Sequence, residues 1–418
     1  MVPVTLPDAL WLAAAGGAAV AWIRLAWLVL RTHRALGRLD LISPAGAAPS
    51  LSAVVPCRDE ARGVEAAVRS LLSQDVPDLE VVAVDDRSTD GTGAILDRLA
   101  REDGRLRVVH VEELPTAWLG KNHACHVGGL RARGDWILFT DGDVLFAPGA
   151  LRRALAYARA LGVGHLVALP RLVAPGLWER AFVTFFAAVG SAALRLFELS
   201  RPGTRGFAGV GAFNLVRRDA WRAVGGHERL ALEVVDDVKL GLLLRRSGVP
   251  QAAVLSAGLV AVRWQHGFFP SVLGLVKNAF AAAEYRPLVS AVSSVGLAFL
   301  GVAPLAALLL ASFAPARALG LAGLALGVGV HAAVARRTAA TSGLEGLLHP
   351  ACALLLAGAL AASAVAASAR GAVVWRGTRY PLDRLRAGCL RMAALPPSGA
   401  PGWAPAPGGS GTAGEHRP

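Results

Sequence analysis

Pairs of carboxylates follow or open short apolar segments at three places in the chain. They are Asp85 with Asp86, Asp141 with Asp143, and Asp236 with Asp237. Carboxylate oxygens can accept hydrogen bonds from a ligand, hold a hard divalent cation, or take a proton from a reacting group. The element that carries each pair determines which of these roles is open to it.

The first pair ends the apolar run VVAV and is followed by the turn sequence RSTDGT. In an open α/β sheet, ligands bind at the carboxyl ends of the strands. Asp85 and Asp86 are therefore placed to hydrogen-bond a nucleotide base or ribose. The alternative is that they are turn residues, with Ser88 or Asp90 capping the next helix.

The second pair lies in WILFTDGDV, where an apolar strand runs directly into Asp141 and Asp143. Two carboxylates that flank one residue can reach a divalent cation and the diphosphate that the cation holds. A set of oxygen ligands favours Mg²⁺ or Mn²⁺. Asp-x-Asp triplets are common in proteins. The metal prediction therefore rests mainly on the position of this triplet at the end of a strand.

The third pair opens the apolar stretch DDVKLGLL, which predicts that Asp236 and Asp237 lie at the start of a helix. The helix dipole stabilises carboxylates there without any function. The functional alternative is a general base for an acceptor hydroxyl. Further along, Arg263 could pair with a diphosphate and Trp264 could stack on a sugar or lipid, or both could be membrane-interface anchors.

The elements that would carry these residues alternate between strands and helices over residues 50–265. Apolar runs predict buried strands, and the intervening segments have apolar residues at helical spacing. This alternation predicts an α/β fold with a parallel, doubly wound sheet. The predicted strands are Leu51–Pro56, Leu79–Val84, Leu106–Val111 and Trp136–Thr140, and the predicted helices between them are Glu60–Ser73 and Thr92–Arg101.

Four other apolar runs are long enough to cross a bilayer. Two further apolar helices that carry charges, Leu177–Leu199 and Phe268–Ala283, are predicted to lie on the membrane surface. A signal peptide is the alternative for the first apolar run, Leu10–Leu30. Against it, Arg24 interrupts this run, and Arg31 and Arg34 follow it. The four runs are Leu10–Leu30, Ala291–Ala311, Ala318–Ala335 and Leu347–Ala369.

These patterns predict six segments. They are a membrane anchor (8–31), a catalytic domain (50–267), an interfacial helix (268–290), three spans (291–370), a basic cytoplasmic or interfacial segment (371–394) and a disordered tail (395–418). The arginines after the first run place the catalytic domain in the cytoplasm, in a multi-pass protein of a bacterial plasma membrane. Four spans would leave both termini outside, whereas the arginines of the 371–394 segment favour the cytoplasm.

Composition excludes several classes of protein. Apolar residues make up 54% and charged residues 17% of the 418 residues, which argues against a wholly soluble enzyme and against a disordered chain. The net charge of +13 comes almost entirely from arginine, and no basic run with interleaved aromatics indicates nucleic-acid binding. The four cysteines are far apart and do not predict a disulfide framework or a zinc site.

In their order, these motifs resemble the inverting family-two glycosyltransferases of the GT-A fold. The matching segments are VVPCRDE, VVAVDDRSTDGT, DGD, DDVKL and RW, together with LPTAWLGKNHA, GGHE and VVWRGTRY. LPTAWLGKNHA is similar to a segment of membrane enzymes that glycosylate lipids, such as ceramide glucosyltransferases and carotenoid- and hopanoid-associated glycosyltransferases. The resemblance covers roughly residues 50–382.

The resemblance implies a role for each matching residue. A nucleotide-sugar donor would be bound by Pro56, Arg58, Glu60, Asp85, Asp86, Lys121 and Asp141, a Mg²⁺ or Mn²⁺ ion by Asp141 and Asp143, and catalysis would rest on Asp237, Asp236, Arg263 and Trp264. Asp237 matches the catalytic base, and Asp236 stands where the family usually has glutamate. Val260 replaces the glutamine of the processive synthases' Q-x-x-R-W motif, which favours transfer of a single sugar.

The sequence therefore predicts a metal-dependent membrane glycosyltransferase that moves one sugar from a nucleotide sugar to a lipid hydroxyl with inversion. A processive polysaccharide synthase is the first alternative, and it would need a longer membrane domain. A non-enzymatic membrane protein is the second, and a transporter would need more polar residues in its spans than His331. The sugar, the nucleotide, the lipid and the oligomeric state are not encoded in any motif.

Overall fold

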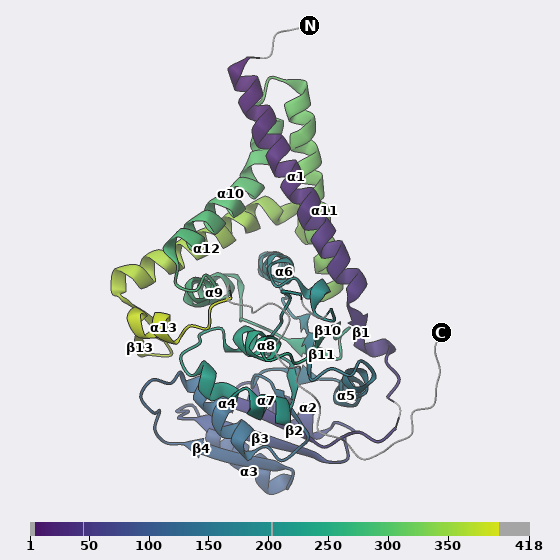
Figure 1. The fold of residues 1–418 in the computed structure, drawn as a ribbon, viewed down its shortest axis with the longest axis vertical. Coiled ribbons are helices and arrows are strands. Elements are labelled where there is room, and N and C mark those ends of the chain that lie inside the picture. The colour runs from purple at the N-terminus through teal and green to yellow at the C-terminus, as the bar shows by residue number, and fades with distance from the viewer. Residues whose placement is uncertain (1–4, 45, 202–203, 393–418) are drawn as a thin grey trace.

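A computed structural model describes residues 5–44, 46–201 and 204–392 (Figure 1). The α/β part fills the lower half of the molecule, and long apolar helices rise from it. The predicted disordered tail, 395–418, lies outside the described residues.

The centre of the α/β part is a twisted sheet whose strands are mostly parallel. Within the described residues it has eight strands in the order β1-β10-β7-β9-β5-β2-β3-β4, with β9 antiparallel to both of its neighbours. The strands are β1 (Gly37–Arg38), β2 (Leu51–Cys57), β3 (Leu79–Asp86), β4 (Leu106–Val111), β5 (Trp136–Phe139), β7 (His165–Leu169), β9 (Asn214–Arg217) and β10 (Gln251–Leu255).

The four strands expected from the sequence are confirmed as β2, β3, β4 and β5, and the parallel α/β architecture is confirmed with them. The two expected helices are present as α2 (Val64–Leu72) and α3 (Thr92–Glu102). The antiparallel β9 was not predicted, because its short apolar run gives no sign of the direction in which the chain enters the sheet.

Helices cover both faces of this sheet. Successive side chains of a strand point to opposite faces, so Ala53 and Val55 of β2 pack into one buried cluster and Val54 into another. The first cluster includes residues of α2, α3 and α5, and the second those of α4, α7 and α8. These further helices are α4 (Gly120–Arg131), α5 (Ala150–Ala160), α7 (Arg218–Ala223) and α8 (Asp236–Arg246).

Two smaller sheets complete the strands that the structure describes. One contains β6 (Leu145–Phe146), β11 (Val260–Val262) and β8 (Arg171–Leu172), in that order. The other is a hairpin of β12 (Ala372–Trp375) and β13 (Thr378–Pro381), followed by α13 (Leu382–Gly388). The hairpin turn contains Arg376 and Gly377, both with positive φ.

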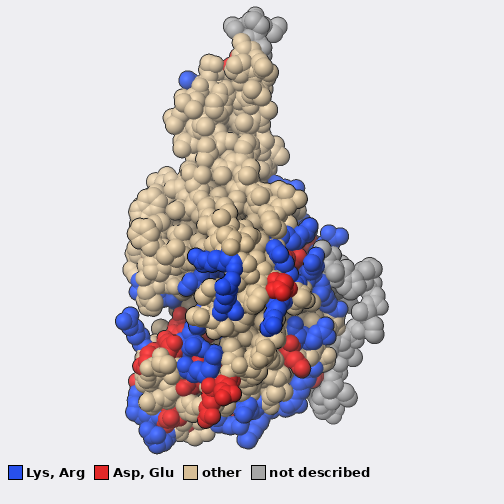
Figure 2. Space-filling view, turned by 90° about the vertical axis from the view of Figure 1, so that its left-hand side faces the viewer, with Lys and Arg blue, Asp and Glu red and all other residues tan. Residues whose placement is uncertain are grey.

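Among the described residues, four helical segments are long and apolar enough to cross a membrane, as the sequence predicted. In Figure 1, α1 and α11 run side by side to the top of the molecule. α10 and α12 pack against each other and are inclined to α1 and α11. The segments are α1 (Leu6–Ala35), α10 (Pro287–Leu310), α11 (Ala314–Thr338) and Leu344–Arg370, which includes α12 (His349–Arg370). Figure 2 shows that charged side chains are nearly absent from this part and crowd onto the α/β part.

The two apolar helices expected on the membrane surface lie between these two parts. α6 (Leu177–Ala193) and α9 (Phe268–Ala282) are seen nearly end-on in Figure 1, across the base of the long helices. Their apolar side chains share one buried cluster with residues of α1, α11 and α12. The membrane helices are thereby fixed directly above the α/β part.

Candidate active site

The loops that follow β2 and β3 are held together by polar turn residues. Glu60 N–H donates to Thr92 Oγ1 (2.8 Å), and Thr89 N–H donates to Asp59 Oδ1 (2.8 Å). Asp90 Oδ2 accepts from the Ala61 N–H at 3.0 Å. The turn residues of STDGT thus have a structural task, which is to hold the ends of two adjacent strands side by side.

Asp85 and Asp86 are buried at the end of β3, as the sequence predicted. Asp86 pairs with Arg87 (2.8 Å) and lies 3.6 Å from the guanidinium of Arg58. Asp85 lies 3.0 Å from Nδ1 of His110 and accepts from the Ser88 N–H (3.2 Å). The N-cap position of α3 is Gly91 in a left-handed conformation, and Asp90 Oδ1 accepts from the N–H of Thr92, the first residue of the helix, at 3.1 Å.

Pro56 and the Asp-Gly-Asp triplet meet at the end of β2. Pro56 lies opposite Val84 in the parallel ladder, and a Cβ at Gly142 would lie 3.7 Å from the Pro56 carbonyl oxygen and 3.6 Å from Cγ of Glu60. Glycine between the two aspartates therefore lets the triplet approach the β2 loop closely. The two carboxylates and the carboxylate of Glu60 form one acidic group.

This acidic group has the character of a cation site. Burial, with Asp141 and Glu60 as negative neighbours, raises the pKa of Asp143 to about 7. Lys121 Nζ lies 2.7 Å from Asp141 Oδ1 and supplies positive charge there. A group of oxygen-only donors fits Mg²⁺ or Mn²⁺. Asp141 and Asp143 are therefore chemically suited to the predicted metal.

The start of α8 brings the third pair of carboxylates to the same place. Lys121 Nζ lies 3.9 Å from Asp236 Oδ1 as well as beside Asp141. Burial disfavours the charged form of Lys121, but the carboxylates of Asp141, Asp236 and Asp237 outweigh it and hold its pKa well above the usual value. Lys121 thus links the predicted metal-binding residues to the predicted catalytic pair.

The backbone fixes the orientation of the Asp237 carboxylate. Asp237 Oδ2 accepts from the Gly211 N–H (2.7 Å), and Oδ1 accepts from the Val238 N–H (2.8 Å). A Cβ at Gly211 would lie 2.6 Å from Asp141 Oδ2, and one at Gly209 would overlap the Asp237 carbonyl oxygen. The glycines of the segment GVG let this loop pass between α8 and the Asp-Gly-Asp triplet.

Burial raises the pKa of both Asp236 and Asp237, while Lys121 lowers it. A carboxylate with a raised pKa is a stronger base than a solvent-exposed one. A general base works best when its pKa approaches the operating pH. The pair at the start of α8 is therefore electrostatically suited to proton abstraction.

Cys125, His227 and Asp236 form a second group of possible metal ligands among the described residues. However, Trp221 Nε1 donates a hydrogen bond to His227 Nδ1 (3.1 Å), and burial lowers the pKa of His227 to about 3. The neutral ring therefore carries its proton on Nε2, and neither ring nitrogen offers a free lone pair. This geometry favours a positioning role for His227 beside Asp236 over a metal site.

Arg263 and Trp264 contact the membrane-side helix α6. Arg263 Nε lies 3.6 Å from Glu179 Oε1, and the Trp264 ring stacks on Phe186 with a centroid distance of 5.3 Å. The structure thus brings together the three carboxylate pairs, Lys121, Arg58 and Glu60, and it places Arg263 and Trp264 against α6.

Sequence reasoning gave no role to two features of the site. Arg376, in the turn of the β12–β13 hairpin, donates to the carbonyl oxygen of Arg58 and lies 3.3 Å from Glu60 Oε1. Gly209 and Gly211 create the space beside Asp237. The segment VVWRGTRY was noted as a motif, but more than 300 residues separate Arg376 from Arg58, and only the fold shows that they meet.

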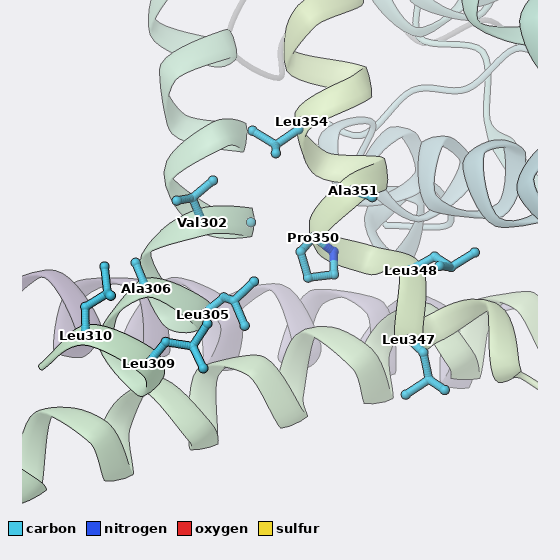
Figure 3. A pocket seen from close by; sticks show the side chains of 11 residues that line it. Val302, Leu305, Ala306, Leu309, Leu310, Leu347, Leu348, Pro350, Ala351 and Leu354 are labelled. Carbon is cyan, nitrogen blue, oxygen red and sulfur yellow. The ribbon is translucent and has the colours of Figure 1, made fainter.

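The larger of the two pockets described lies away from these residues. It is a crevice of ≈ 470 Å³ between α10 and the start of α12, and its lining residues are all apolar (Figure 3). A second pocket of ≈ 200 Å³ lies beside the loop that leads into α4. This loop leads directly to Lys121 of the carboxylate site. The second pocket is therefore closer in sequence to that site than the first pocket is.

Comparison with known proteins finds a family match for part of the α/β region. Residues 52–225 match the family model described as Glycosyl transferase family 2. Curated relatives include the 4,4'-diaponeurosporenoate glycosyltransferases of Staphylococcus aureus strains USA300 and MRSA252, at 25% identity over 236 residues and 26% over 237. Each match covers 56% of this chain and 62% of the relative, so the matched region spans about three fifths of those proteins.

A solved structure shares the fold. It is a mannosyltransferase from Pyrobaculum calidifontis in complex with GDP-Man and Mn²⁺, with a TM-score of 0.53 and 21% sequence identity. The match covers 85% of this chain and 98% of that one. The GT-A architecture expected from the motifs is thus confirmed.

Proposed function

We propose that this chain, whose residues 52–225 form a glycosyl transferase family 2 domain, is a membrane glycosyltransferase that moves one sugar from a nucleotide sugar to a lipid hydroxyl with inversion. One observation carries the proposal. Lys121 lies 2.7 Å from Asp141 and 3.9 Å from Asp236, so a group that suits a metal–diphosphate lies beside a group that suits proton abstraction. Transfer from an activated donor to a hydroxyl is accelerated by both.

The donor would bind across the ends of β2 and β3. Asp85 and Asp86 would accept hydrogen bonds from hydroxyl and ring N–H groups of a nucleoside, and Arg58, 3.6 Å from Asp86, would interact with negative charge on the donor. Asp141 and Asp143 would hold a divalent ion, which would neutralise charge on the diphosphate as it leaves. Mn²⁺ in the mannosyltransferase that shares the fold is consistent with such an ion.

Asp237 would act as the base. Its carboxylate takes the proton of the acceptor hydroxyl, the oxygen attacks the anomeric carbon, and the bond from that carbon to the donor phosphate breaks. Nucleoside diphosphate leaves from the opposite side, so the configuration inverts. The hydrogen bonds from Gly211 and Val238 keep the basic oxygens in place throughout.

A lipid acceptor is supported by the position of the membrane helices. α6 and α9 lie between the carboxylate site and the spans, so a hydroxyl at the bilayer surface is close to the site (Figure 1). The Staphylococcus aureus relatives are named for 4,4'-diaponeurosporenoate, a carboxylate on a long apolar chain. A cytoplasmic catalytic domain follows from the arginines after the first span.

A processive polysaccharide synthase is the second candidate function, and two observations argue against it. Val260, in place of glutamine, lies in β11 and pairs with Phe146 of β6. A channel for a growing polymer would require more spans than the four candidates among the described residues. Single transfer is the reading that both observations favour.

The test uses membranes that contain the protein and a panel of radiolabelled nucleotide sugars, with and without EDTA. Label in the extracted lipids that disappears with EDTA would support the proposal and identify the donor. Label only in an insoluble polymer would favour the synthase. No incorporation from any donor, with folded protein and host lipids present, would refute a transferase function.

A further inference from the structure

A small pocket adjoins the two loops that lead into α4 and α8, the helices that carry Lys121 and Asp236. Its walls are the segment Leu114–Trp118 before α4, Leu232 before α8, and residues of β13 and α13. The two loops are joined where the pocket ends, since the Leu119 N–H donates to the Ala231 carbonyl oxygen at 2.8 Å. Lys121 and Asp236 follow these loops within a few residues.

The pocket lies at the level where the last membrane helix ends. α12 stops at Arg370, and the guanidinium of Arg379 donates to the Arg370 carbonyl oxygen at 2.6 Å. The Leu382 N–H donates to the Gly371 carbonyl oxygen at 3.0 Å. The end of a span lies among lipid headgroups, so a pocket attached to it opens into the headgroup region.

Its lining has two chemical characters. One part is apolar or aromatic and includes Leu114, Trp118 and Leu385. The other part carries the exposed guanidinium groups of Arg379 and Arg384. Neither arginine has a salt bridge to an acidic side chain among the residues described, although Asp383 is adjacent in sequence to Arg384. Figure 2, which looks onto this side of the molecule, shows basic side chains gathered at the border of the uncharged part.

This combination of apolar and basic lining residues favours one chemical class of ligand. Guanidinium groups bind carboxylate or phosphate in a paired geometry, whereas the apolar wall favours hydrocarbon. A volume of ≈ 200 Å³ holds the equivalent of roughly seven waters, which suits a compact headgroup and excludes a whole lipid chain. A soluble anion would leave the apolar wall in contact with water, and a neutral lipid would leave both arginines without an anionic partner.

We propose that the pocket between Leu114–Trp118, Leu232 and the β13–α13 segment binds an anionic headgroup of the lipid acceptor, a carboxylate or a phosphate, and so positions the acceptor for transfer. The inference rests on the proposed function and adds the chemical class of the acceptor. The crevice between α10 and α12 contributes no such selectivity, because its lining is entirely apolar.

The test compares acceptors that differ only in headgroup charge. A long-chain hydroxy acid, its methyl ester and the matching hydroxyalkyl phosphate are supplied in neutral phosphatidylcholine vesicles to the full-length protein. The wild type is expected to use the acid or the phosphate with kcat/KM at least about tenfold above the ester, from one charge-assisted contact. The Arg379→Gln/Arg384→Gln variant should lose this preference through KM, with the KM for the donor unchanged.

A matched control removes two arginines from the membrane end of another helix, in Arg336→Gln/Arg337→Gln of α11, and should keep the preference. Equal use of the acid and the ester by the wild type would overturn the inference. So would an equal loss for both acceptors in the Arg379/Arg384 variant. Restoration of ester transfer by added phosphatidylglycerol, in the wild type alone, would instead assign the pocket to bulk anionic lipid and overturn the acceptor role.

Direct binding separates this inference from the proposed function. A fluorescent long-chain fatty acid is titrated into the purified protein without any donor. Weaker binding to the Arg379/Arg384 variant than to the wild type and the control supports the pocket even where no transfer is seen. Equal binding to all three proteins refutes the pocket whatever the transfer assay shows.

Discussion

Replacing Asp237 by asparagine removes the proposed base and keeps the shape of the side chain. Both carboxylate oxygens accept backbone N–H groups, from Gly211 at 2.7 Å and from Val238 at 2.8 Å. In the variant, one oxygen becomes an NH₂ group that faces a donor. The change therefore affects both the chemistry and the local packing, and the two effects have separate magnitudes.

The rate effect follows from the loss of general base catalysis. Such catalysis contributes about 10²- to 10⁴-fold, which corresponds to about 3–5 kcal/mol of activation free energy. The stability effect is the loss of one hydrogen bond to a charged group, at about 1.5–3 kcal/mol before relaxation. Asp237→Asn should thus lose most of its transfer rate while the protein remains folded.

The assay measures transfer rate, donor affinity by calorimetry, and thermal unfolding on the same preparation. Asp219→Asn is the control, because Asp219 also accepts a backbone N–H, from Ala220 at 2.7 Å, and lies on α7 outside the site. The account expects the transfer rate of Asp237→Asn to fall at least a hundredfold, with donor affinity within about threefold of wild type. A rate within threefold of wild type would refute the base assignment, and so would loss of donor binding in a folded protein.

Three further predictions concern the same site. Lys121→Gln removes the positive charge that lowers the pKa of Asp237, so the pKa rises further and the acid limb of the kcat–pH profile should move to higher pH; an unchanged limb would contradict this coupling. Gly209→Ala should lower kcat by at least tenfold, since a Cβ would overlap the Asp237 carbonyl oxygen, whereas Gly104→Ala, with open space around it, should leave kcat unchanged. Asp143→Asn should raise the Mn²⁺ concentration for half-maximal activity by tenfold or more in a metal titration; an unaltered titration would exclude Asp143 as a ligand.

The sequence predicted the parts of this structure that depend on local patterns. Alternating apolar runs and helical spacings indicated β2 to β5, and the carboxylates at their ends followed from where strands stop. The membrane spans could be predicted from the sequence because length and hydropathy alone determine whether a helix can cross a bilayer. Asp236 and Asp237 were correctly expected at the start of a helix, because an apolar helical run follows them.

The features that were missed depend on contacts distant in sequence. Arg376 reaches Glu60 only because the hairpin after α12 folds back over the β2 loop. The close approach of Gly209 to α8 depends on how a loop without a recognisable motif is packed. The contact of Arg263 with Glu179 likewise depends on the position of α6, which no local pattern encodes.

The most direct measurement is the structure of the product formed by the purified protein. The protein is placed in vesicles with the donor identified in the membrane assay and with a lipid acceptor, and the glycolipid is analysed by mass spectrometry and NMR. The account predicts one sugar per lipid, joined to a hydroxyl, with the anomeric configuration opposite to that of the donor. A lipid carrying several sugars, or a product with the donor's configuration, would contradict a single inverting transfer by Asp237.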